Sequence, residues 1–308
     1  MKTKKGFSLI ELLIVIGIIA VLGGVMLTQF SSSTESAMAA NCLNHMRTLS
    51  NSVIADASKN GYYPSAGPYK YISVKANGGS ESKWEQGWIG NDEGGQPVSA
   101  YSDDELQKYY AITNGSIWRT TKGAGGAYLC PSHEHYCKNR KIVKPGWSYV
   151  MNSYFGWDVE NQAASRNMFK RKYGDGYFTF RYTSAPKNRK RALEKVLLFA
   201  EMPFADNGVH EKPDFNPAAD DANDSILKYK ADGDNTKFNR TGNVDEYIGF
   251  NHKSGQNYSA HVAFADGHCA KLMLPMDASL DNIIELTTWL CTGREYTFDG
   301  REYQEVVE

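Results

Sequence analysis

The hydrophobic and polar positions of this 308-residue chain are distributed very unevenly. Residues 7–27 are almost uniformly apolar, and Glu11 is the only charged side chain among them. As a helix this stretch would rise roughly 31 Å, about the thickness of the hydrocarbon core of a bilayer. Because Lys2, Lys4 and Lys5 precede it, the positive-inside rule predicts a cytoplasmic N-terminus and an exported C-terminal bulk.

A second helical pattern follows the apolar stretch. Between residues 37 and 57, apolar side chains recur at helical spacing while polar ones occupy the opposite face. This pattern predicts an amphipathic helix that packs on a sheet. Gly23-Gly24 and residues 31–34 are predicted weak points or bends, and Pro64, after Asn60-Gly61, is expected to end the helix.

The rest of the chain contains short apolar runs that are typical of strands. Strands are predicted at residues 127–130, 147–152, 177–183 and 195–201. Two more are predicted at residues 258–265 and 268–274. Asp266-Gly267 joins them in a two-residue hairpin turn, because both residues tolerate a positive φ.

Two further helices are predicted in the head. A short one is expected near residues 102–110, and the apolar spacing of residues 277–291 predicts a last helix with an Asp or Ser N-cap. A long N-terminal helix followed by an antiparallel sheet places the chain in the α+β class.

The composition agrees with a folded domain attached to an apolar end. Hydrophobic residues make up 41% of the chain and aromatic residues 12%, which is enough to bury a core and excludes wholesale disorder. A formal net charge of −1 leaves no basic footprint, so nucleic acid is not an expected partner. The mean hydropathy of −0.51 is polar despite the apolar end, which suits a chain that crosses a membrane boundary.

The apolar N-terminus has three interpretations. A secretory signal peptide has a shorter apolar region and a small-residue cleavage site, whereas Gln29-Phe30 and three serines follow here. A plain membrane anchor explains the length but not Glu11, because a carboxylate in a spanning helix costs about 2.5–3.5 kcal/mol and normally has a partner. The third interpretation, a prepilin segment, explains the lysines, the length and the carboxylate together.

The segment from Gly6 through Phe7 to Glu11 resembles the processing site of type IV prepilins and type II secretion pseudopilins. The resemblance implies that a prepilin peptidase cuts after Gly6 and methylates the new N-terminal Phe7. Glu11 then becomes the fifth residue of the mature chain, where the family keeps a glutamate. In a fibre that carboxylate pairs with the terminal amine of a neighbouring subunit.

The resemblance implies a pilin-like α+β fold, in which the long helix packs on the antiparallel sheet of an exported head. Its organisation is a leader at 1–6, a transmembrane assembly helix at 7–27, an amphipathic extension at 28–60 and a globular head at 61–308. The implied function is structural and not enzymatic: a minor or specialised subunit of a type IV pilus or type II secretion pseudopilus. The implied partners are the prepilin peptidase, other pilin or pseudopilin subunits, an inner-membrane assembly platform and the lipid bilayer. The implied location is the inner membrane, crossed once, or a periplasmic or surface fibre.

Patches of the head resemble one branch of pilin-like proteins, whose C-terminal signature is a His, nine residues and then Asp-Gly. The patches lie at residues 41–49, 128–132, 148–154 and 196–201. The signature is altered here, because His252 precedes Asp266-Gly267 by thirteen residues. Either four residues are inserted in the loop, or His252 is not the equivalent residue.

The five cysteines all lie on the predicted exported side, where an oxidising environment favours disulfides. They are Cys42, Cys130, Cys137, Cys269 and Cys291. We favour a Cys42–Cys130 bond, which would join the long helix to the sheet and matches the two cysteines of the resembled branch. Closure of a short loop between Cys130 and Cys137 is the alternative.

Metal binding is weighed at two places. Cys130, His133, His135 and Cys137 offer zinc ligands. Structural zinc sites usually take ligands from two separated knuckles, however, and exported thiols tend to oxidise, so no metal site is predicted.

No cofactor is expected. Calcium is the one considered, because secretion pseudopilins resemble this architecture and residues 220–224, Asp232 and Asp234 offer oxygen donors; a solvated acidic loop is favoured there.

Catalysis and ligand display are the remaining alternatives. His252, His261, His268 and Asp266 cluster in sequence, and Cys130 is an imaginable nucleophile. No nucleophile elbow, P-loop or HExxH pattern accompanies them, so no catalytic residue is predicted. The alternative function is a membrane-anchored binding module that displays aromatic, Gly-rich loops to a glycan or another ligand. Its candidate contacts are Trp84, Trp88, Trp118 and Trp157.

Overall fold

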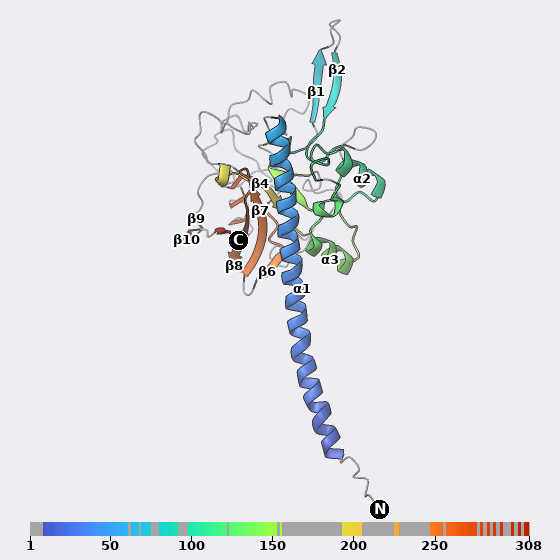
Figure 1. Cartoon of the computed structure of the whole chain (residues 1–308), viewed down its shortest axis with the longest axis vertical. Helices are drawn as coiled ribbons and strands as arrows, with labels where there is room; N and C mark the ends of the chain where they lie inside the picture. Colours follow the sequence, from blue (N-terminus) through green and yellow to red (C-terminus); the bar gives the residue numbers. More distant parts are fainter. Residues whose placement is uncertain are drawn as a thin grey trace, which may run out of the picture.

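The computed structural model describes most of the long helix and the central part of the head (Figure 1). The described residues are 9–60, 63–67, 69–74, 80–91, 98–121, 123–152, 155, 193–204, 225–227, 247–254, 257–275, 278–279, 282–283, 286–287, 290–291, 297–298, 301–302 and 305–307. In this part of the chain a single long helix projects from a head in which helices and a sheet surround its C-terminal half.

The long helix, α1 (Leu9–Asn60), is helical without interruption over 52 residues. The predicted weak points at Gly23-Gly24 and residues 31–34 therefore do not interrupt the helix. A glycine inside a helix costs only about 1 kcal/mol relative to alanine, which two long flanking helical runs outweigh. The predicted end of the helix near Asn60 is confirmed.

The main sheet of the head is seven-stranded, with the order β11-β8-β7-β4-β3-β5 and with β6 also paired to β7. Its strands are β3 (Tyr149–Asn152), β4 (Leu197–Glu201), β5 (Ile226–Leu227), β6 (His252–Ser254), β7 (Asn257–Phe264), β8 (Cys269–Pro275) and β11 (Glu305–Val307). All pairings are antiparallel except that of β3 with β5. This is the α+β, pilin-like arrangement expected: a long N-terminal helix on an antiparallel sheet.

Smaller elements decorate this framework. They are the hairpin of β1 (Tyr69–Val74) with β2 (Ser80–Glu85), the helices α2 (Glu105–Asn114), η1 (Gly125–Tyr128), α3 (Pro131–Arg140) and η3 (Leu193–Lys195), and the paired strands β9 (Thr297–Phe298) and β10 (Arg301–Glu302). Figure 1 shows β1 and β2 projecting from the end of the head that is farthest from the N-terminus. The hairpin and α3 lie in stretches where the sequence pattern predicted no such elements.

The C-terminal half of α1 is part of the core. Its buried apolar residues follow the predicted helical spacing, and they are Cys42, Leu43, Met46, Leu49, Val53 and Ala57. α1 contacts β7, β8, β4 and β6 of the sheet, and it also contacts α3 and η1. The predicted amphipathic helix is confirmed, and its apolar face fixes α1 to the head.

The predicted strands have mixed outcomes. β3 and β4 fall inside the predicted ranges 147–152 and 195–201, and α2 confirms the short helix with a shift of a few residues. The strand predicted at 127–130 is wrong, because η1 leads there into α3. The range 177–183 lies outside the described residues. The described residues of 282–291 are helical, and Ser279 caps them by accepting a bond from the Asn282 amide.

The predicted hairpin of β7 and β8 is confirmed, but the predicted two-residue turn is wrong. The Ala263–Cys269 pair and the bond from the Phe264 amide to the His268 carbonyl leave a three-residue loop of Ala265, Asp266 and Gly267. In this loop Gly267 alone has a positive φ, of +97°. A type I turn followed by a left-handed glycine is the usual three-residue hairpin, and it needs no positive φ at Asp266.

Candidate functional site

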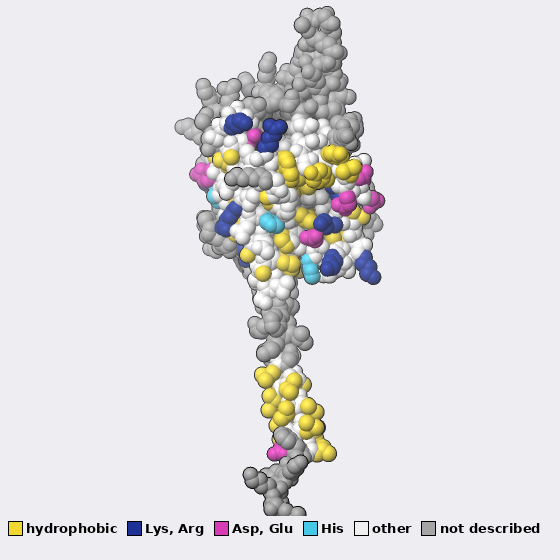
Figure 2. Space-filling model, turned by 45° about the vertical axis from the view of Figure 1, so that its right-hand side comes forward, with side chains coloured by type: hydrophobic (Ala, Val, Ile, Leu, Met, Phe, Trp, Pro, Cys, Tyr) yellow, Lys and Arg dark blue, Asp and Glu magenta, His cyan; other side chains and the backbone are white. Residues whose placement is uncertain are grey.

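Residues 9–22 of α1, here called the stem segment, carry large apolar side chains on every side of the helix. These side chains are 46–77% exposed, and Figure 2 shows them covering the visible face of the helix below the head. Glu11 lies among them and is exposed as well. A helix that is apolar all round is normally buried in lipid or among other helices.

The predicted processing residues, Gly6 and Phe7, lie outside the described residues. Among the residues that are described, no helix holds an apolar stretch that is long enough to be recognised as a membrane span.

Residues 42–57 of α1, here called the anchor segment, are tied to the head by a disulfide and by hydrogen bonds. Cys42 is bonded to Cys130, which is the N-cap residue of α3, so the preferred pairing is present in the structure. The bond closes a sequence separation of 88 residues, and the loop-entropy relation gives roughly 4–5 kcal/mol for a loop of that size. Tyr149 adds a buried hydrogen bond to the Cys42 carbonyl (3.2 Å), and His45 bonds the Leu129 carbonyl (3.0 Å).

The alternative pairing of Cys130 with Cys137 does not occur. Cys137, Cys269 and Cys291 remain thiols, and all three are buried. Burial, with the nearby charge of Glu134, raises the pKa of the Cys137 thiol to about 11. Since the thiolate is the reactive form of cysteine, this thiol is poorly suited to act as a nucleophile.

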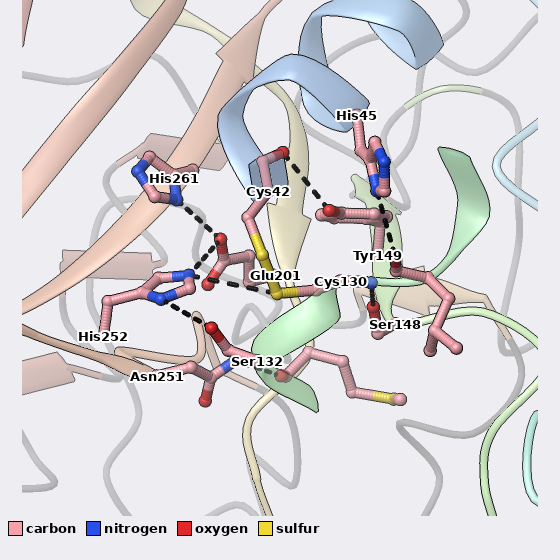
Figure 3. Close-up of a disulfide and its surroundings, with 12 residues drawn as sticks. Cys42, His45, Cys130, Ser132, Ser148, Tyr149, Glu201, Asn251, His252 and His261 are labelled. Carbon is pink, nitrogen blue, oxygen red and sulfur yellow. Dashed lines mark hydrogen bonds and ion pairs between the residues drawn. A yellow bond between two sulfur atoms is a disulfide. The ribbon is translucent and has the colours of Figure 1, made fainter. Parts of the chain in front are cut away.

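A buried cluster of one carboxylate and two imidazoles lies next to the disulfide (Figure 3). Glu201 Oε1 is 3.0 Å from His252 Nε2 and 2.8 Å from His261 Nδ1, and all three side chains are almost completely buried. The sheet register explains this meeting: Glu201 ends β4 and lies one residue beyond the Ala200–Val262 pair, opposite His261 of β7. β6 brings His252 to the same place.

The cluster is electrostatically coupled. Burial alone would lower the pKa of His252, but the charge of Glu201 and the hydrogen bonds that the ring donates to Glu201 and Glu35 raise it to about 9. Burial alone would likewise raise the pKa of Glu201, but the charge of His252 and hydrogen bonds from both histidines lower it to about 2. At neutral pH the two side chains therefore form a buried ion pair.

His252 also connects the cluster to both helices. Its Nδ1 atom is 3.2 Å from Ser132 Oγ on α3 and 3.6 Å from Glu35 Oε1 on α1, whereas its Nε2 atom is 4.0 Å from Cys130 Sγ. The sequence offered one signal for Glu201, a lone acid that closes an otherwise apolar strand. That signal did not identify its partners.

The two parts of the altered signature lie apart. His252 pairs with Ser259 at the start of β7, whereas Asp266 and Gly267 lie in the loop beyond its far end. The β6–β7 hairpin and the whole of β7 occupy the thirteen intervening residues. The two parts therefore have different surroundings. His252 lies in the buried cluster, whereas the Asp266-Gly267 loop contacts α1.

The Asp266-Gly267 loop rests on the anchor segment. Ser50 Oγ donates to the Gly267 carbonyl (3.2 Å), and a Cβ atom at Gly267 would lie 3.2 Å from Ile54 Cγ1. Asp266 Oδ1 accepts bonds from the His268 amide (3.1 Å) and the His268 ring (2.6 Å). Asp266 therefore stabilises the turn, and His268 supplies the amide and the ring nitrogen to which its carboxylate bonds.

The zinc ligand set considered at 130–137 does not come together. Cys130 is in the disulfide, while His135 is exposed and bonded to Asn139. His133 is fully buried and lies 2.8 Å from the Tyr101 hydroxyl; burial lowers its pKa to about 3, against the opposing charge of Glu201. The acidic stretch 220–224 and Asp232 and Asp234, considered for calcium, lie outside the described residues.

The tryptophans considered for ligand binding are not gathered on a described surface. Trp88 is fully buried, packs on Tyr128 and Phe199, and donates from its ring to the Ser225 carbonyl (3.0 Å). Trp118 is half-buried. The side chain of Trp84 and the whole of Trp157 lie outside the part described. Trp88 is therefore a core residue.

Comparison with known proteins identifies the N-terminal segment. Residues 1–27 match the family model of the prokaryotic N-terminal methylation motif. Comparisons with curated proteins and with solved structures gave no match. The family-model match at residues 1–27 is to a prepilin-type signal of the kind found in type IV pilin-like and pseudopilin subunits. It covers Gly6, Phe7 and Glu11. The likeness of the head to the branch with the His and Asp-Gly signature stays a prediction.

Proposed function

We propose that this chain is a minor or specialised structural subunit of a type IV pilus or a type II secretion pseudopilus. It is cleaved after Gly6, methylated at Phe7 and held in the inner membrane by residues 7–27, with its head exported. The observation that carries this proposal is the stem segment: a helix apolar on every face, with one acid and the methylation motif at its start.

Glu11 has a defined task in this proposal. A carboxylate in an apolar helix bundle is expensive unless a cation neutralises it. Cleavage after Gly6 creates such a cation, the methylated amine of Phe7 on a neighbouring subunit. The pair sets the axial register between subunits, because the attraction between two opposite charges is strong in a low dielectric and is greatest when the two groups are in contact.

The head follows the stem as a rigid attachment. α1 runs unbroken from Leu9 to Asn60, and its anchor segment is fixed by a core stripe and a disulfide. Force applied to the stem by an inner-membrane assembly platform is therefore transmitted directly to the head. A head of some 250 residues (308 − 60 = 248) on one stem would crowd a fibre surface, which favours a minor or specialised position.

The first experiment is the mass of the N-terminal peptide from the membrane fraction and from the sheared surface fraction of cells that express the native chain. A peptide that begins at methylated Phe7 supports processing, and its recovery from sheared material supports a fibre. An intact Met1, or cleavage beyond residue 27, contradicts the proposal.

The second experiment separates a fibre subunit from the alternative, a displayed binding module. Glu11→Ala should abolish recovery in the sheared fraction while the chain stays in the membrane. Leu12→Ala, which removes apolar area from the neighbouring position without removing a charge, is the matched control and should still assemble. A chain that merely displays a binding module would tolerate both substitutions equally.

A further inference from the structure

We propose that Cys42, Cys130, Glu201 and His252 form a zinc site whenever the two cysteines are thiols rather than a disulfide. One ligand atom from each residue lies within 4.8 Å of the others, and all four residues are buried. Figure 3 shows the four side chains converging from α1, the start of α3, β4 and β6. The proposal does not depend on the proposed function.

The donor set and its spacing suit zinc. Two sulfurs, an imidazole nitrogen and a carboxylate oxygen are the atoms that bind zinc in proteins, usually in a tetrahedron. Bonds of about 2.0–2.3 Å to zinc place such ligand atoms roughly 3.3–3.8 Å apart. Cys130 Sγ and His252 Nε2 are 4.0 Å apart, close to this range, and the Glu201 carboxylate lies beside His252 Nε2. Breaking the disulfide lets the two Sγ atoms move apart to this spacing, and shifts of the carboxylate and the imidazole would complete the tetrahedron.

The surrounding hydrogen bonds orient the ligand atoms as they do in known metal sites. A metal-binding histidine normally donates its other ring nitrogen to a carboxylate or a polar oxygen. His252 Nδ1 has such neighbours in Ser132 Oγ (3.2 Å) and Glu35 Oε1 (3.6 Å). Its Nε2 atom, which lies 3.0 Å from Glu201 Oε1 in the disulfide form, would bind the metal after losing its proton. This outer layer comes from α3 and α1, so it forms only when both helices are in place.

Glu201 is prepared in the same way. His261 Nδ1 holds one carboxylate oxygen, Oε1, at 2.8 Å. The other oxygen, Oε2, is buried without a hydrogen-bond partner in the part of the chain that the structure describes. A buried carboxylate oxygen without a partner is costly. Coordination of a cation by Oε2 would remove this cost.

The electrostatics of the reduced state favour a dication. Cys130 begins α3, and the N-terminus of a helix favours a thiolate. Two thiolates and the Glu201 carboxylate would outweigh the single positive charge of His252, and a protein interior tolerates such an excess of buried negative charge poorly. Zinc neutralises most of this charge and holds α1 to α3 through Cys42 and Cys130, as the disulfide does.

The conversion between the two states is a balanced reaction. A dithiol reductant gives two electrons and two protons to the Cys42–Cys130 bond, which breaks to two thiols while the reductant becomes a disulfide. Zinc binding then displaces both thiol protons and the Nε2 proton of His252 to solvent. Oxidation by a disulfide-bearing partner runs the other way, re-forms the sulfur–sulfur bond and releases the zinc.

The test uses the full chain in detergent micelles, without oxygen, before and after treatment with a phosphine reductant. Zinc is added, free metal is removed by gel filtration, and bound zinc is measured by elemental analysis. We expect one zinc per chain after reduction and none before it. Cobalt in place of zinc should show the thiolate charge-transfer bands and the visible absorption of a tetrahedral site.

Variants locate the site. Cys42→Ser with Cys130→Ser should lose the bound zinc, whereas Cys137→Ser, at a buried thiol outside the cluster, should keep it. His252→Asn should lose the tetrahedral cobalt spectrum. The proposal is overturned if the reduced chain binds no zinc, or if Cys137→Ser abolishes binding while the double variant keeps it.

A measurement on the unmodified chain covers the case in which the variants fail to fold. Zinc bound to the reduced chain should protect Cys42 and Cys130 from alkylation, read residue by residue from peptide masses, and should leave the alkylation of Cys137 unchanged. Equal protection of all three thiols, or of none, would mean that zinc does not bind at this cluster.

Discussion

The stem and anchor segments belong to one unbroken helix but have opposite surroundings. In the stem segment, large apolar side chains are 46–77% exposed on all sides. In the anchor segment, the apolar stripe from Cys42 to Val53 is at most 3% exposed, and polar residues occupy the other faces. The same secondary structure thus serves two purposes, and the distribution of apolar residues around the helix distinguishes them.

The difference shows where each segment obtains its stability. The anchor segment is stabilised inside the chain, by burial of its stripe and by the disulfide. The stem segment leaves its apolar surface uncovered within the described structure, so burial of that surface requires lipid or other helices. Substitutions in the two segments should therefore have separable consequences: loss of the folded head in one case and loss of insertion or assembly in the other.

The largest expected effect comes from placing the same charge in each segment. Met46→Asp buries an unpaired carboxylate in the core, where Met46 is 0% exposed. We expect a loss of more than about 5 kcal/mol, comparable to the whole stability of a typical domain. Ile16→Asp, in the stem segment, should leave the head folded and reduce membrane insertion by about 2.5–3.5 kcal/mol.

The measurement is resistance of the head to protease in detergent, together with the amount of chain in the membrane fraction. Met46→Asp should lose the protease-resistant head, and Ile16→Asp should keep it but shift out of the membrane. A head that unfolds equally in both variants would show that the two segments are not separable.

The sequence predicted the parts of the fold that depend on local pattern. The stripe from Leu43 to Ala57, the buried strand β4 and the β7–β8 hairpin all follow from periodicity or from a turn dipeptide. The pattern does not predict α3, because Leu129-Cys130 resembles the end of a strand. The signal was Pro131, which has no amide hydrogen to lose at the first position of a helix and follows an extended Cys130.

The buried cluster could not be predicted in the same way. Glu201 meets partners that are 51 and 60 residues away in sequence, and the meeting depends on the register between β4 and β7. The length of the β7–β8 loop could not be predicted for a related reason. Ala265 continues the apolar pattern of β7 and is buried, so nothing in the sequence marks it as a loop residue. The Cys42–Cys130 bond is the predicted pairing. The resemblance to a pilin-like branch with two cysteines favours it, whereas the spacing of the five cysteines alone does not select a pairing.

The next effect concerns the ion pair at the point where α1 enters the head. Glu201→Gln removes the nearer of the two carboxylates that face a protonated His252 and leaves only Glu35, at 3.6 Å. Loss of one member of a buried pair costs about 3–5 kcal/mol. The matched control is Glu134→Gln, which breaks a half-exposed pair with Lys144 and should cost under about 1 kcal/mol. Urea unfolding at pH 6 measures both, and equal losses would contradict the assigned role of the cluster.

The same pair gives a pH dependence with a defined sign. The pKa of His252 is raised from 6.5 to about 9, so its contribution is complete below pH 6.5 and is lost as the pH rises toward 9. The pKa of Glu201 is lowered from 4.5 to about 2, so its contribution is complete above pH 4.5 and is lost as the pH falls toward 2. Stability should therefore fall between pH 6.5 and 9, and Glu201→Gln should flatten this fall.

The smallest effect concerns the contact between the hairpin loop and the anchor segment. Gly267 has a φ of +97°, and a residue with a side chain loses about 1–2 kcal/mol in the left-handed region. Gly267→Ala should cost this amount and an additional contact term, because the new methyl group would lie 3.2 Å from Ile54 Cγ1.

Gly123→Ala separates the cost of the left-handed backbone from the cost of the contact with Ile54. Gly123 also has a positive φ, of +77°, but a Cβ atom there meets only the Trp118 ring, at 3.8 Å. It should therefore show the backbone term alone. In a double-mutant cycle, Ile54→Ala should offset about 0.5 kcal/mol or more of the Gly267→Ala loss and none of the Gly123→Ala loss, since only the first pair is in contact. Urea unfolding of the five chains with the wild type supplies the cycle. Absence of coupling between Ile54 and Gly267 would mean that the loop touches α1 without constraining it, and the anchor segment would then depend on its apolar stripe and the disulfide.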